Sequence, residues 1–316
     1  RKTADSDEQI LRRQDAIISG NKITTQIWNY GSISEPGNRV TDIIWEGLGY
    51  GYEFGPFISA EVPLLNNNHP DAYPKVINGD TTWYARVISD GLVTDPERSP
   101  DGSEYWTWEP LAYSDEGLFF ADPDYDKIPT ASDIDRDFDG KPDSWASDWY
   151  NPNLKEYVWP GDLRQGASNA DEEAFFVCDD RNNKEFEYYP FPDDSSRKGL
   201  GIQIEYRYYQ WANPLAEDII FLIYKITNKS PKDLENVIFG MWGDPHIGGP
   251  SDWSDDLSYF DQEINMVYCW DEDGSASGSA NRPGYFGYKF LESPGNPYDQ
   301  LDNDSDGMID ESRSCL

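Results

Sequence analysis

The stretch EDIIFLIYKITNKS, residues 217–230, contains a continuous apolar run, IIFLIY, at 219–224. A run of this length, rich in β-branched and aromatic residues, is typical of a strand that is buried on both faces. The next strand pattern, KDLENVIFGMWGD at 232–244, follows the turn-rich segment TNKSPKDLEN at 227–236. We therefore expect a hairpin of two antiparallel neighbours, with 219–224 as a central strand.

Strand patterns continue outward in both directions, and turn residues separate them at short intervals. One short helix is expected at 5–18, DSDEQILRRQDAII, with Ser6 as its N-cap and Gly20 after its end. Many short strands with very little helix predict an all-β fold, an antiparallel β-sandwich or jelly-roll-like domain. The other strand patterns are KITTQIWNYG (22–31), RVTDIIWEG (39–47), YGYEFGPFISAEV (50–62), TWYARVISDG (82–91), GLGIQIEYRYYQWA (199–212), EINMVYCWDEDG (263–274) and GYFGYKFLES (284–293).

The charge of the chain is strongly negative, since 60 Asp and Glu against 25 Lys and Arg give a formal net charge of −35 at pH 7. Nucleic acid and anionic membrane surfaces would be repelled, so neither is expected as a partner. No apolar run is long enough to span a bilayer. Metal cations are the natural counter-charge. Aromatic residues make up 15% of the chain, which predicts a folded protein rather than a disordered acidic segment.

An acidic motif, D-x-D-x-D-G-x-x-D, occurs twice. Ca²⁺ binds six to eight oxygen ligands, and carboxylates at alternate positions converge on one ion when the chain curls around it. Glycine at the sixth position allows the sharp turn, and the seventh residue offers its main-chain carbonyl. The predicted calcium ligands are Asp135, Asp137, Asp139, Lys141 and Asp143 in the first loop, and Asp302, Asp304, Asp306, Met308 and Asp310 in the second, with Gly140 and Gly307 at the turns.

Neither loop is a complete EF-hand, because the twelfth position is Ala146 in one and Arg313 in the other. The pattern resembles the calcium loops of thrombospondin type 3 repeats and of related bacterial secreted proteins, in which a neighbouring segment or water supplies the missing ligand. Asp133, Asp148 and Glu311 are the local candidates for it. The alternative is that both loops are solvated acidic turns.

A wider resemblance rests on YGYEFGPFISAEV, on YQWANPLAEDIIFLIYKITNKS (209–230) and on GMWGDPHIGGPSDWSDD (240–256). These stretches resemble a group of large secreted bacterial proteins, typically exported by the type IX pathway and mostly without an assigned function. NPYDQLDNDSDGMIDES (296–312) is similar to their way of ending a β-domain with a calcium-loop linker. The resemblance implies an extracellular or cell-surface location and no particular reaction.

The segment 114–184 interrupts the strand patterns and is rich in Asp, Asn, Pro and Trp. Excursions of this length need a metal, a ligand or a packed aromatic cluster to hold them. We therefore expect an N-terminal helix or linker at 1–19, a composite β-sandwich domain at 20–296 that contains this insertion, and a C-terminal calcium-loop linker at 297–316.

A third cation site is conceivable at 244–256, although an exposed glycine-rich turn explains the same pattern. Neither His246 nor His69 has the spacing of a zinc site. The sequence also leaves open whether Cys178 and Cys269 form a disulfide. The residues of the third candidate site are Asp244, His246, Asp252, Asp255 and Asp256.

Catalytic signals are poor, because GSASG places Ala276 where a G-x-S-x-G motif has its nucleophile. We expect a calcium-stabilised structural or adhesive module, with other copies or other surface proteins as partners, and not an enzyme. The alternative is a carbohydrate-binding module or a glycan-active enzyme, since a glycosidase needs only two suitably spaced carboxylates. Its sugar-stacking side chains would be Trp106, Trp108, Trp145 and Trp149, although such aromatics also serve as core residues.

Overall fold

The computed structural model describes residues 13–34, 39–91, 99–111, 128–276 and 279–291. Within these ranges the regular structure is β-strand, apart from one short 3-10 helix, η1 (Ser147–Trp149). All strand pairs are antiparallel, and the sheets stack as a sandwich, so the expected all-β fold is confirmed.

The larger sheet has eight strands in the order β1-β2-β3-β5-β7-β6, with β4 pairing with β2 and β5, and β14 pairing with β5. Glycines in β14 make room for aromatic rings of the paired strand: Gly240 lies opposite Phe57 and Gly243 opposite Phe54. A Cβ atom at either glycine would lie 2.1 Å from the facing ring. The strands are β1 (Asp15–Ile18), β2 (Ile23–Trp28), β3 (Ile33–Ser34), β4 (Ile43–Trp45), β5 (Leu48–Leu64), β6 (Tyr73–Ile77), β7 (Asp80–Asp90) and β14 (Glu235–Pro245).

The second sheet has four strands in the order β13-β12-β11-β8. In β12 the residues alternate, so that Ile204 and Tyr206 face the sandwich interior while Glu205 and Arg207 face the other side. The strands are β8 (Glu109–Pro110), β11 (Glu172–Asp179), β12 (Ile202–Gln210) and β13 (Ile220–Asn228).

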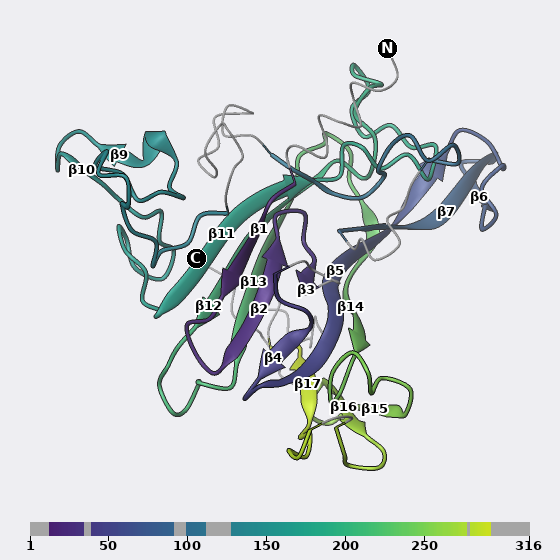
Figure 1. Cartoon of the computed structure of the whole chain (residues 1–316). Helices are drawn as coiled ribbons and strands as arrows, with labels where there is room; N and C mark the ends of the chain where they lie inside the picture. The colour runs from purple at the N-terminus through teal and green to yellow at the C-terminus, as the bar shows by residue number, and fades with distance from the viewer. Residues whose placement is uncertain (1–12, 35–38, 92–98, 112–127, 277–278, 292–316) are drawn as a thin grey trace.

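The main core lies between these two sheets (Figure 1), because buried side chains of both belong to one hydrophobic cluster. Burial of this apolar surface is the main source of stability for such a sandwich. Members of the cluster include Ile27, Ile58 and Val62 from the larger sheet and Phe176, Ile204 and Tyr206 from the smaller one.

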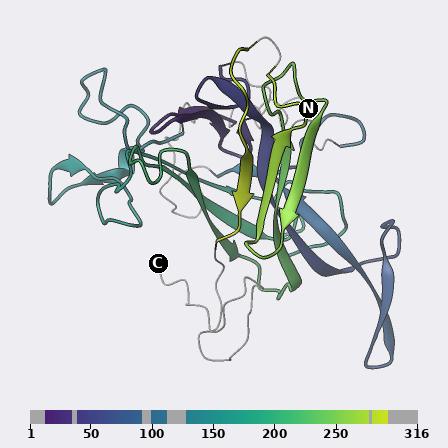
Figure 2. The ribbon, with the colours of Figure 1, turned by 90° about the horizontal axis from the view of Figure 1, so that it is seen from below.

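Two smaller sheets complete the described structure, and Phe286 and Tyr288 of one of them pack against the main core. A three-stranded sheet, in the order β15-β16-β17, lies at one end of the sandwich, where it shares a small buried cluster with β5 (Figures 1 and 2). A two-stranded ribbon, β9 with β10, belongs to the segment between β8 and β11, 128–171 in its described part, which we call the irregular region. These strands are β9 (Tyr150–Asn151), β10 (Glu156–Tyr157), β15 (Asp256–Asp261), β16 (Met266–Asp271) and β17 (Phe286–Lys289).

The expected hairpin at 217–244 is wrong. Strand β13 pairs with β12 in the smaller sheet, whereas β14 pairs with β5 in the larger one, so the turn between them crosses from one sheet to the other. Strand β13 is also an edge strand and is only half buried, not central. Its inner residues Ile220, Leu222 and Tyr224 pack against the core, while Phe221 contacts Trp211 on the opposite face.

The structure also bears on the expected N-terminal helix, on the expected irregular segment and on the two cysteines. The helix expected at 5–18 is wrong at Asp15–Ile18, which form β1 and pair with β2; residues 1–12 lie outside the described part. The segment expected to be irregular up to 184 contains the sandwich strand β11. Cys178 and Cys269 are both free and buried, in different clusters.

Candidate metal centre

The first acidic loop, 133–145, lies beside β11, at the edge of that strand that does not pair with β12. A short extended segment leads into it: Thr130 forms a β-bridge with Ala174, and the Ala131 N–H donates to the carbonyl of Glu173 at 2.8 Å. At the far end the Trp145 indole N–H donates to the carbonyl of Thr130 at 2.9 Å. Both ends of the loop are therefore fixed to the sandwich through Thr130 and Ala131.

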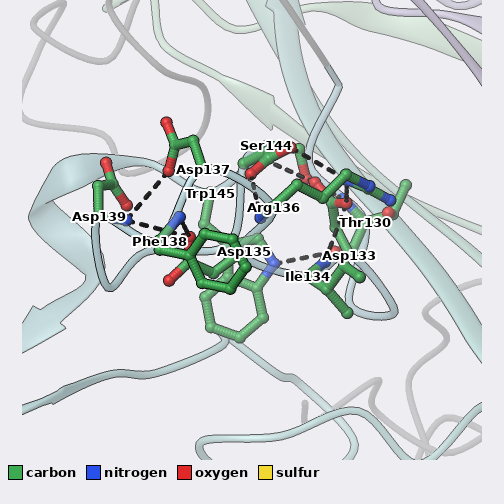
Figure 3. A network of polar contacts seen from close by, with 11 residues as sticks. Thr130, Asp133, Ile134, Asp135, Arg136, Asp137, Phe138, Asp139, Ser144 and Trp145 are labelled. Atoms are coloured by element: carbon green, nitrogen blue, oxygen red, sulfur yellow. Dashed lines mark hydrogen bonds and ion pairs between the residues drawn. The ribbon is translucent and has the colours of Figure 1, made fainter.

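Within the loop, the carboxylates accept hydrogen bonds from the backbone that follows them (Figure 3). Asp135 accepts from Phe138 N at 2.7 Å and from Gly140 N at 2.9 Å, while Asp139 accepts from Lys141 N at 2.8 Å. Phe138 and Gly140 have positive φ angles of 65° and 94°. Glycine adopts this left-handed conformation without steric cost, so Gly140 suits the sharp turn of the loop.

The curl brings Asp135, Asp137 and Asp143 together, with one carboxylate oxygen from each within 4.8 Å of the others. Oxygens on opposite sides of a Ca²⁺ ion lie about 5 Å apart, since each Ca–O distance is about 2.3–2.6 Å. The three oxygens are therefore spaced to bind one such ion. Asp139 is not a member of this group, and the Lys141 side chain donates to the carbonyl of Trp145 at 2.7 Å.

Two residues brace the loop from one side. The Arg136 guanidinium contacts Asp133 at 2.5 Å and Asp143 at 3.1 Å. Asp133 also accepts from Ile134 N at 2.9 Å and from Ser144 N at 2.7 Å. Burial raises the pKa of Asp133, but the hydrogen bonds from Arg136 and Ser144 outweigh it and hold the pKa below the ordinary aspartate value. Asp133 therefore braces the loop. Asp148, the other local candidate, is exposed and lies outside the group.

A tryptophan cluster lies beneath the loop. Trp145, Trp149 and Trp159 are buried, and their ring centroids lie 5.4–6.0 Å apart. Trp108 is buried in the main core. Three of the four side chains considered for sugar stacking, Trp108, Trp145 and Trp149, therefore present no open face, and Trp106 is partly buried.

The second acidic loop, 302–310, with its predicted ligands Asp302, Asp304, Asp306, Met308 and Asp310, lies outside the described residues. The expectation of calcium there stays a prediction.

In the third stretch, 244–256, the candidate ligands lie in different places and do not form one site. Asp244 lies in β14 opposite Glu53, and His246 Nδ1 lies 3.0 Å from the buried carboxylate of Asp42. Asp252 and Asp255 lie together, and the sequence reasoning missed their neighbour Asp271. The short pattern D-x-D-G at 271–274 could have indicated that Asp271 is a ligand. Nothing in the sequence, however, shows that this pattern lies close to Asp252 and Asp255. Asp256 accepts a hydrogen bond from Ile247 N at 3.0 Å.

Comparisons with protein-family models, with curated proteins and with solved structures gave no match. The candidate centres therefore rest on the geometry of the chain's own residues. Across the described ranges, no helix is long and apolar enough to cross a membrane.

Proposed function

We propose that this chain is a calcium-stabilised, extracellular β-sandwich module with a structural or adhesive role. The observation that carries the proposal is the convergence of Asp135, Asp137 and Asp143 in a curled loop whose two ends are fixed to the sandwich. All three side chains offer oxygen, the donor that hard cations such as Ca²⁺ prefer. One bound ion would offset the mutual repulsion of the carboxylates and hold the loop in shape.

The position of the loop supports a stabilising role for the ion. The ligands come from one short segment, which lies on the buried tryptophan cluster and beside β11. An ion there would order the segment 128–171, in which η1 and the ribbon of β9 and β10 are the regular elements that the structure describes. Calcium sites of extracellular modules bind with Kd of about 10⁻⁴–10⁻³ M, which suits the calcium concentration outside cells.

The adhesive part of the proposal is supported by two edge strands of the sandwich. Both β13 and β14 end a sheet, and edge strands present unpaired backbone groups to other chains. Apolar side chains are exposed along them, among them Ile226, Val237, Ile238 and Trp242. We expect another copy of this chain, or another surface protein, to be the partner of these edges.

Calorimetric titration of Ca²⁺ into the chelated protein tests the site. Asp135→Asn removes one charge from the converging group, and we expect this variant to take up one ion fewer than the wild type. The matched control is Asp148→Asn, which makes the same charge change at an exposed neighbouring position outside the group. It should titrate like the wild type. Equal uptake and affinity in Asp135→Asn would show that the loop is only a solvated acidic turn.

Limited proteolysis tests whether the ion orders the loop. Phe138 is 89% exposed at the tip, so cleavage by chymotrypsin after this residue reports on the opening of the loop. We expect chelation to make this cleavage the first one in the described region, and calcium to suppress it in the wild type but not in Asp135→Asn. Identical digestion with and without chelator would contradict the proposed role.

A further inference from the structure

The three-stranded sheet meets β5 at one end of the sandwich (Figures 1 and 2). A second group of carboxylates comes from this sheet and from the loop before it. Asp252 and Asp255 belong to the loop that follows β14, and Asp271 ends β16. One oxygen from each lies within 4.8 Å of the other two. Gly248 has a positive φ of 97°, and a Cβ there would lie 2.7 Å from Asp252 Oδ2, so the backbone passes close to this carboxylate.

The sheet register adds a fourth carboxylate. Asp256 of β15 lies directly opposite Asp271 of β16, so the two side chains share one face of the sheet. Like charges at directly opposed positions destabilise a strand pair. A nearby positive charge would offset the repulsion between Asp256 and Asp271.

The hydrogen bonding of Asp271 provides an independent observation. Its side chain is only 6% exposed, and its Oδ1 accepts from Gly274 N and, at 3.0 Å, from Ser275 N. Its Oδ2 is buried and has no hydrogen-bond partner among the described residues, and the same holds for Asp256 Oδ1. Buried polar atoms in folded proteins are nearly always paired, and burying an unpaired charge is costly.

Lysine and arginine side chains of the described residues do not supply the missing partner. In the described part of the chain, neither Asp255, Asp256 nor Asp271 forms an ion pair with lysine or arginine. His246 interacts electrostatically with Asp256, but its Nδ1 already contacts Asp42 at 3.0 Å. Among the described residues, the buried Oδ2 of Asp271 therefore has neither a hydrogen-bond donor nor a lysine or arginine as its partner.

We propose that Asp252, Asp255 and Asp271 bind a calcium ion that is separate from the one in the loop at 133–145. The three oxygens have the spacing that Ca–O distances of about 2.3–2.6 Å require. The ion gives the buried oxygen of Asp271 its partner and offsets the repulsion between Asp271 and Asp256. This site goes beyond the proposed function, because it does not depend on calcium at Asp135, Asp137 and Asp143.

The ion fastens the three-stranded sheet to the sandwich. At this junction Phe286 and Tyr288 of β17 pack against Phe54. A small buried cluster also contributes, made of Leu48, Tyr50, Ile247, Cys269 and Ala276. The proposed ligands connect the loop between β14 and β15, which carries Asp252 and Asp255, with the last residue of β16, Asp271. The same loop is attached to β5, since Gly248 N donates to the carbonyl of Gly49 at 2.9 Å. Calcium should therefore slow local opening of the three-stranded sheet more than opening of the main sandwich.

The test combines calcium titration with amide hydrogen exchange on the full chain. Asp271→Asn keeps an oxygen for Gly274 N and Ser275 N but removes the charge, and Asp255→Asn removes a second ligand charge nearer the surface. Asp261→Asn is the control, because Asp261 lies in β15 but outside the group. We expect Asp271→Asn and Asp255→Asn each to bind one ion fewer than the wild type, and Asp261→Asn to bind the same number.

Hydrogen exchange separates this site from the first one. Calcium should protect amides at 247–256 and 271–276 at least several-fold in the wild type and in Asp135→Asn, but not in Asp271→Asn. If Asp271→Asn and Asp255→Asn both keep the wild-type number of ions and the same protection, the proposal is wrong. Loss of protection only at 133–145 in Asp135→Asn would bear on the first site alone.

Discussion

At the scale of single residues, Arg207 connects the irregular region to the sandwich. Its guanidinium pairs with Glu173 at 2.7 Å and donates to the carbonyl of Pro160 at 2.7 Å. It also lies 4.1 Å from the centre of the Phe175 ring. Arg207 and Glu173 are 4% and 1% exposed, so both charges are buried. The Arg207 Nε also lies 3.5 Å from Glu205 and 3.6 Å from Asp162, which are more exposed. The pair positions the tryptophan cluster, and hence the loop above it.

Removing one member of this pair should cost more than removing the charge of both. Arg207→Met leaves Glu173 buried without its partner, and we expect a loss of about 3–5 kcal/mol in the free energy of unfolding. Arg207→Met combined with Glu173→Gln should recover part of that loss, because no buried charge remains. Urea denaturation at neutral pH measures both. Arg86→Met is the control at an exposed position and should change stability by about 0.5 kcal/mol or less. A double variant no more stable than Arg207→Met would contradict this reasoning.

At the scale of elements, β13 is less deeply buried than β12, although β13 has the continuous apolar run and β12 alternates apolar with polar residues. Ile204 of β12 and Ile226 of β13 are direct cross-strand partners, and they are 0% and 38% exposed. Ile204→Ala should leave a cavity costing about 2–5 kcal/mol. Ile226→Ala should cost about 1 kcal/mol or less, because its side chain is already partly in water. Equal losses in urea denaturation would mean that β13 is covered in solution.

This contrast shows which features the sequence could predict. The strand patterns at 199–212 and 50–62 predict strands correctly, because side-chain alternation is a local property. The place of a strand within its sheet depends on distant partners, so the apolar run at 219–224 did not reveal that β13 lies at an edge. Helix propensity at 15–18 was likewise overridden by pairing with β2, since propensity is a weak prior.

The two candidate metal sites also differ in how far the sequence alone predicts them. Asp135, Asp137 and Asp143 lie within nine residues, so their spacing alone predicted that they meet. Asp271 meets Asp252 and Asp255 only because β15 and β16 pair in register. A site assembled by sheet pairing from separate loops leaves no contiguous motif to read.

At the scale of the whole molecule, the net charge of −35 makes protons and calcium alternative counter-charges. Burial raises the pKa of Asp180 to about 7, although hydrogen bonds from Leu200 N and Ile202 N oppose the shift. Burial, reinforced by the charge of Asp271, also raises the pKa of Asp256 to about 6. Both values lie above the ordinary aspartate pKa, so the folded state binds these protons more tightly than the unfolded state does.

The sign of the pH dependence follows from those shifts. Stability from Asp180 and Asp256 is fully present below the unfolded pKa of about 4 and is lost as the pH rises through 6 and 7. Without divalent cations, the midpoint of thermal unfolding should therefore be higher at about pH 5 than at about pH 8. Asp133, whose pKa is lowered, has the opposite effect on stability, but its contribution is lost only below about pH 4.

Millimolar calcium should raise the midpoint of thermal unfolding more at the higher pH, because there it competes with fewer protons for carboxylates. Circular dichroism melts with chelator and with calcium at both pH values measure this. A midpoint in chelator that is unchanged or higher at the higher pH would show that protons do not relieve the crowding of acidic groups in the folded chain.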